Sequence, residues 1–142
     1  VFIRYKKLYI SIPIIMISIS EIVIILGIAS IIHWTIDLAA MAGIIAAIGT
    51  GVDHQIVITD ESLMEKGGEK RKRKSIKKRV EQAFFIIFTS AFTTIGAMAP
   101  LAYLSLGMLR GFAVTTIIGL VIGLTITRPA YGSIAKILLK NQ

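Results

Sequence analysis

The sequence predicts an all-α protein, a polytopic transmembrane helical bundle. Hydrophobic residues make up 55% of its 142 residues, and the mean hydropathy is +0.79. A soluble domain of this length needs far more polar surface than such a composition supplies. Four apolar runs each approach the ~20 residues that an α-helix needs to cross ~30 Å of hydrocarbon. The composition and the four runs together favour four membrane-spanning helices.

The first two spans are separated by a short linker. The first is predicted over residues 8–32, and its richness in isoleucine makes it the best candidate for a lipid-facing helix. The linker, residues 33–37, contains Trp34, an aromatic residue suited to the membrane interface. The second span is predicted over residues 38–59.

A strongly basic segment, residues 62–82, follows the second span. Nine of the sixteen Lys and Arg residues lie between Lys66 and Arg79. Because positively charged loops remain in the cytoplasm, we expect this segment, residues 1–7 and the C-terminus on the cytoplasmic side. Helical spacing of apolar residues also allows an interfacial helix here. A solvated run of charges beside anionic lipid is the favoured interpretation over a specific partner site, and no motif supports nucleic-acid binding.

The last two spans are predicted over residues 83–104 and 111–135, with a tight turn at 105–110 between them. Together the four spans and the basic segment make a transmembrane domain covering residues 8–139. Helices in lipid associate through close backbone approach at small residues. Such residues gather on the second and fourth spans, at Ala39, Ala40, Ala42, Gly43, Ala46, Ala47, Gly119 and Gly123. The pattern therefore predicts a packed bundle and not four independent anchors.

The strongest functional signal is Asp53, which lies in the second span about 8 Å from its cytoplasmic end at ~1.5 Å per residue. An ionisable residue in hydrocarbon costs a few kcal/mol, so it indicates a functional site. Gly49 and Gly51 leave room beside it for a helix or for water. His54 and Gln55 follow it, but successive residues point about 100° apart around a helix. A neutral, hydrogen-bonded His54 is favoured over a proton shuttle.

Hydroxyl groups form a ladder along the third span, at Thr89, Ser90, Thr93 and Thr94. Each hydroxyl can bond to its own backbone carbonyl four residues earlier, which is the favoured interpretation for any single residue. Collectively they could instead line a polar surface opposite Asp53.

Glu21 lies almost at the centre of the first span. A carboxyl group there is either protonated and hydrogen-bonded or faces a cation. The candidate cations, Arg110 and Arg128, lie near opposite ends of the fourth span, where an Arg can also snorkel to the interface. No catalytic constellation, nucleotide-binding loop or metal-ligand spacing is present, and cysteine is absent. We therefore predict no enzyme activity, no metal and no cofactor. The one chemical capability that the sequence indicates is proton binding at a carboxylate within the membrane.

Three patches resemble the SecD/SecF protein-export membrane proteins of the RND superfamily. They are residues 36–58, Phe92-Thr93-Thr94 and residues 107–115, in the family's order and spacing. The likeness covers essentially the whole chain. Residues 1–7 resemble the cytoplasmic connector after the second helix of SecD proteins, and the four spans resemble the third to sixth helices. His54 and Gln55 depart from the bacterial pattern, so the chain is similar to the archaeal branch.

The resemblance implies one half of an RND-type core in an auxiliary subunit of the Sec machinery, which promotes protein export in the cell membrane. It implies that Asp53 relays protons, with Thr93 and Thr94 near it; His54, Gln55 and Glu21 would complete a polar network. The implied partners are a SecF-type membrane protein, the Sec channel, the translocating polypeptide and membrane lipids. Two alternatives stay open: an RND-type exporter of lipids or small molecules, and a scaffold that transports nothing.

Overall fold

The computed structural model describes residues 8–63, 76–104 and 107–140. These residues form helices joined by turns and contain no strand, which confirms the all-α prediction. The elements in chain order are α2 (Leu8–Ile31), α3 (Leu38–Leu63), α4 (Ile76–Leu104), α5 (Met108–Ile122), the π-helix η1 (Gly123–Thr127) and α6 (Arg128–Lys140). Helices α2, α3 and α4 and the continuous stretch from α5 to α6 are each long and apolar enough to cross a membrane.

Local chemistry explains the turn between the first two helices. His33 adopts a left-handed conformation with φ of 52°, and the Trp34 amide donates to the Ala29 carbonyl at 2.9 Å. A left-handed residue ends a helix because it turns the chain out of the helical path. Asp37 then begins α3, because its carboxylate accepts a 2.7 Å hydrogen bond from the Ala40 amide.

Several helices extend beyond the predicted spans. Helix α3 continues to Leu63, α4 already begins at Ile76 within the predicted basic segment, and α5 begins at Met108 within the predicted turn. The predicted connector, residues 1–7, and residues 64–75 of the basic segment lie outside the described residues.

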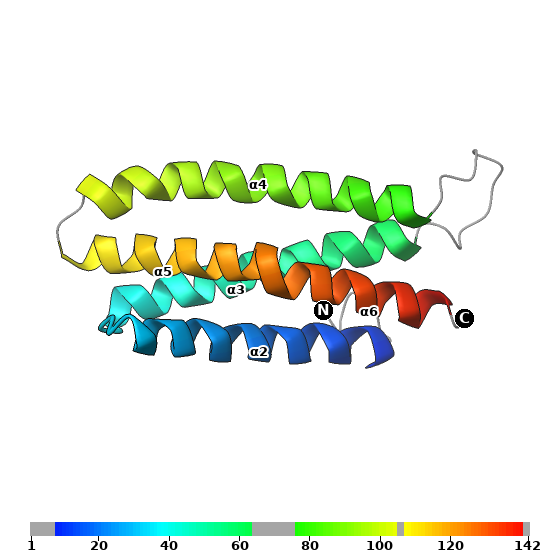
Figure 1. Ribbon diagram of the computed structural model, residues 1–142, viewed down its shortest axis with the longest axis horizontal. Coiled ribbons are helices and arrows are strands. Elements are labelled where there is room, and N and C mark those ends of the chain that lie inside the picture. Colours follow the sequence, from blue (N-terminus) through cyan, green and yellow to red (C-terminus); the bar gives the residue numbers. More distant parts are fainter. Residues whose placement is uncertain (1–7, 64–75, 105–106, 141–142) are drawn as a thin grey trace.

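The four spans run alternately in opposite directions, with α3 and α5 at the centre and α2 and α4 on either side (Figure 1). The contact between α3 and α5 is the most extensive in the bundle. A methyl group at Gly43 would lie 2.5 Å from the Phe112 carbonyl oxygen, and one at Gly119 would overlap Ala47. Small residues thus let the two backbones approach closely, as expected from the sequence.

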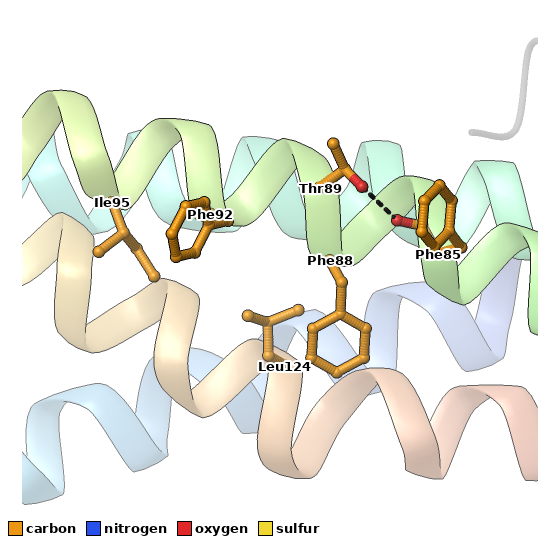
Figure 2. A pocket seen from close by; sticks show the side chains of 6 residues that line it. All are labelled: Phe85, Phe88, Thr89, Phe92, Ile95 and Leu124. Carbon is orange, nitrogen blue, oxygen red and sulfur yellow. Dashed lines mark hydrogen bonds between the residues drawn. The ribbon is translucent and has the colours of Figure 1, made fainter.

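Helix α4 is the least buried of the four spans within this chain, whereas the expectation that the first span faces lipid stays a prediction. In the most apolar window of α4 only 11% is buried, against 22% for α2. Helix α2 is more enclosed because it turns Ile14, Glu21 and Ile25 into the bundle. Between α4 and η1 lies an open apolar groove (Figure 2), lined by Phe85, Phe88, Thr89, Phe92, Ile95 and Leu124.

Candidate functional site

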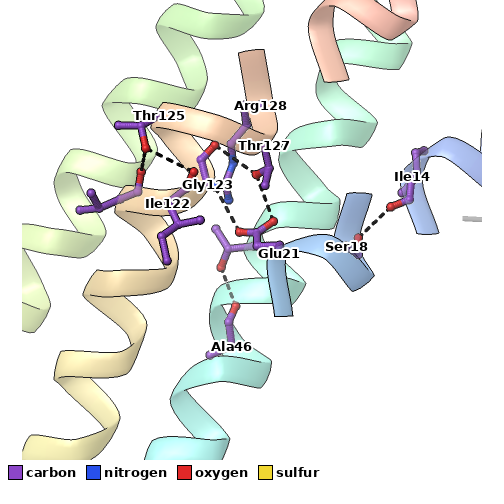
Figure 3. A network of polar contacts seen from close by, with 11 residues as sticks. Ile14, Ser18, Glu21, Ala46, Ile122, Gly123, Thr125, Thr127 and Arg128 are labelled. Atoms are coloured by element: carbon purple, nitrogen blue, oxygen red, sulfur yellow. Dashed lines mark hydrogen bonds and ion pairs between the residues drawn. The ribbon is translucent and has the colours of Figure 1, made fainter. Parts of the chain in front are cut away.

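A buried ion pair lies in the bundle core, between the first span and the last. Arg128 Nη1 lies 3.4 Å from Glu21 Oε1, and both side chains are 1% exposed. The Thr127 hydroxyl donates to Glu21 Oε2 at 3.2 Å (Figure 3). Of the two candidate cations, the structure therefore selects Arg128 as the partner of Glu21, whereas Arg110 is exposed at the start of α5.

The π-helix places Arg128 in the core. The Arg128 amide donates to the carbonyl of Gly123, five residues earlier, as in a π-turn. The next residue, Pro129, has no amide hydrogen, so it cannot donate the α-helical hydrogen bond to the carbonyl four residues earlier. The guanidinium group then folds back onto Gly123, where even a methyl group would overlap it. Arg128 consequently points inward, although snorkelling to the interface is common for an Arg near a span's end.

Helix α3 closes the site from a third side. A methyl group at Gly51 would lie 3.0 Å from Glu21 Oε2 and 3.3 Å from Arg128 Nη2, so α3 passes directly beside the pair. His54 and Gln55, one turn further along the same face, are 5% and 1% exposed. Four buried polar atoms of these side chains have no hydrogen-bond partner among the described residues: Arg128 Nε and Nη2, His54 Nδ1 and Gln55 Oε1.

Asp53 is separated from this site by the helical geometry. Its side chain is exposed on the surface of α3, whereas His54 and Gln55 are buried. Among the described residues, none donates a hydrogen bond to its carboxylate. The row of acid, imidazole and amide in the sequence is therefore not a single three-residue site.

The threonines of α4 bond within their own helix. Thr93 donates to the Thr89 carbonyl at 2.9 Å, and Thr94 donates to the Ser90 carbonyl at 3.0 Å. Thr93 is exposed and Thr94 is half-buried. Within the described part of the chain, neither hydroxyl bonds to Asp53.

Polar bonds between helices occur elsewhere, at positions that the sequence did not single out for this role. The Thr115 hydroxyl shares its hydrogen between the Gly111 carbonyl of its own helix, at 2.9 Å, and the Ala40 carbonyl, at 3.0 Å, and the second contact joins α5 to α3. Thr59 and Tyr131 share a buried hydrogen bond between α3 and α6. The sequence shows only that these residues carry hydroxyl groups. Which hydroxyl bonds to which helix depends on how the helices pack. In the described ranges, no group of three His, Asp or Glu side chains could hold a metal ion.

The fold and its buried polar residues define a multi-pass α-helical membrane protein. Residues 1–134 match the family described as protein export membrane protein SecD/SecF, C-terminal, and the chain belongs to this family.

Named relatives support the same assignment. The chain is 56% identical over 139 residues to the protein-export membrane protein SecD of Methanocaldococcus jannaschii, covering 98% of this chain and 34% of that protein. It is 55% identical over 142 residues to the SecD protein of Thermococcus gammatolerans, covering 100% of this chain and 27% of the relative. For the SecD protein of Haloferax volcanii the identity is 50%, with the same two coverages, 100% and 27%. The chain thus spans about a third or less of the length of these curated relatives.

Proposed function

We propose that this chain is the membrane part of an auxiliary subunit of the Sec machinery that promotes protein export. The observation that carries the proposal is the match of residues 1–134 to the SecD/SecF family, together with relatives named as protein-export membrane proteins. The proposed partners are a SecF-type membrane protein, the Sec channel and the exported polypeptide. The proposal includes no enzymatic reaction and no cofactor.

Asp53 supports a proton-coupled form of this function. Its carboxylate is exposed on a helix that is apolar enough to span the bilayer. A charged residue facing lipid costs about 2.5–3.5 kcal/mol near the centre of a span. We therefore infer that a protein surface outside this chain covers Asp53, or that water reaches it. A carboxylate in such a setting can bind a proton and release it as its surroundings change.

The charge distribution supports an orientation in the cell membrane. The start of α2, the end of α3, the start of α4 and the end of α6 lie at the same end of the bundle (Figure 1). Of the nine basic residues between Lys66 and Arg79, the last three belong to the first turn of α4, which lies at this end: Lys77, Lys78 and Arg79. By the positive-inside rule, this end faces the cytoplasm.

An export assay with the full-length protein tests the role of Asp53. We expect Asp53→Asn to leave membrane insertion and protein level unchanged and to reduce the rate of export, because Asn cannot carry the proton. Asp37→Asn is the matched control, since Asn also caps a helix well and Asp37 lies before α3. Normal export by the Asp53→Asn protein would refute the proton role and favour the scaffold. Loss of substrate efflux with normal export would favour an RND-type exporter.

A further inference from the structure

The buried ion pair joins the first span, through Glu21, to the fourth span, through Arg128, and it is separate from the exposed Asp53. We propose that this pair is a latch that holds α2 against η1 and α6, and that proton uptake by Glu21 opens it. The inference goes beyond the proposed role of Asp53, because different residues on different helices carry it.

The contact is weak for a buried ion pair. Charge-assisted hydrogen bonds between N–H and carboxylate groups are usually about 2.7–2.9 Å long, whereas Arg128 Nη1 and Glu21 Oε1 are 3.4 Å apart. In the part of the chain that the structure describes, Arg128 Nε and Nη2 have no acceptor, although the side chain is 1% exposed. Desolvation offsets much of the attraction between buried charges, so the pair is maintained only while both groups carry their charge.

Few titratable groups face Glu21 in the described part of the chain. From η1 and α6 it meets Thr127 and Arg128. From α3 it meets Gly51. His54 lies one turn further along α3, where the charge of Arg128 acts on its imidazole. The central helix α5 contributes no charged group to the pair among the described residues. Proton uptake by Glu21 is therefore the direct way to remove the attraction.

Loss of the carboxylate charge leaves Arg128 as an uncompensated buried cation, which is strongly unfavourable. A second acceptor lies on the polar face of α3, because Gln55 Oε1 is buried and has no hydrogen-bond partner within the described ranges. A turn of the Arg128 side chain away from Glu21 removes the polar link between α2 and the fourth span. Contacts of α2 with η1 and α6 are much less extensive than those between α3 and α5. Helix α2 is therefore the element that we expect to shift.

Distance measurements between spin labels on α2 and α6 test the latch in the full-length protein in lipid nanodiscs. Met16 and Ser133 are exposed, and this chain contains no cysteine of its own. After both are replaced by labelled cysteines, we expect a single short distance in the parent protein. Glu21→Gln, which imitates the protonated carboxyl group, is expected to add a second, longer population. Glu81→Gln, an exposed neutralisation on α4, is expected to change nothing.

The double variant Glu21→Gln, Arg128→Met decides whether charge or packing is responsible. It removes both charges, so no unpaired buried cation remains to drive α2 away from η1 and α6, and we expect the single short distance to return. An unchanged distribution in Glu21→Gln, or a long population that persists in the double variant, overturns the latch. If Glu21→Gln does not accumulate in the membrane, accumulation of the double variant supports the proposal, and its failure to accumulate overturns it. Asp53→Asn is expected to leave the distances unchanged, so failure of the latch and failure of the proton role remain distinguishable.

Discussion

Gly123 is expected to tolerate no side chain, because the guanidinium group of Arg128 occupies the space beside its Cα atom. In Gly123→Ala the new methyl group displaces the guanidinium group and breaks the pair with Glu21, which is 1% exposed. Breaking a buried pair costs about 3–5 kcal/mol and Ala gains about 1 kcal/mol over Gly in a helix, so we expect a net loss of roughly 2–4 kcal/mol. Gly27→Ala is the matched control, since nothing lies within 4 Å of a methyl group there.

The free energy of unfolding of the full-length protein, measured by denaturant titration in mixed micelles, provides the assay. We expect Gly123→Ala to unfold at a clearly lower denaturant concentration and Gly27→Ala to match the parent or exceed it by up to about 1 kcal/mol. Equal stability of the two variants would show that the guanidinium group relocates without cost. The pair with Glu21 would then not be what holds Arg128 in the core.

Two further substitutions test the packing of the central helices. Gly43→Ala is expected to lose about 1–3 kcal/mol of stability in the same titration, because its methyl group would lie 2.5 Å from a backbone oxygen. Gly96→Ala is the control and should lose none, because a methyl group there meets no described atom within 4 Å. Thr115→Val is expected to cost about 0.6 kcal/mol through its lost bond to α3, the average for hydrogen bonds between membrane helices. Thr93→Val, whose hydroxyl bonds only within α4, should cost less, and equal losses would count against a stabilising role of the bond between helices.

The number of spans and the closely packed pair of helices could be predicted from the sequence. Hydropathy and length alone fix the spans, because backbone hydrogen bonds in lipid must be satisfied within each helix. The small residues at Gly43 and Gly119 mark the closest approach of α3 and α5, because only residues of this size permit it. Periodicity also separates Asp53 from His54, and the structure shows one exposed and the other buried.

The sequence reduces the candidate cations for Glu21 to two, Arg110 and Arg128, but does not decide between them. Both are arginines, and each lies near one end of the fourth span. The choice depends on the π-turn before Pro129, which adds one residue to the turn and rotates Arg128 inward. The π-helix is only five residues long, so its extra residue does not change the hydrophobic periodicity of the sequence enough to be recognised.

Helix α3 separates two carboxylates that the sequence grouped in one polar network. Gly51 and Asp53 are two residues apart, about 200° around the helix, so they face opposite directions. Gly51 lies against the Glu21–Arg128 pair, and Asp53 is exposed on the other side. The internal carboxylate has a cation within the chain, whereas the exposed one has no partner among the described residues. In the two proposed roles, a proton on Glu21 alters contacts inside this bundle, and a proton on Asp53 alters contacts with the surface that we propose to cover α3. The two proposed protonation events act on different interfaces, so a substitution at one carboxylate is expected to leave the contacts of the other unchanged.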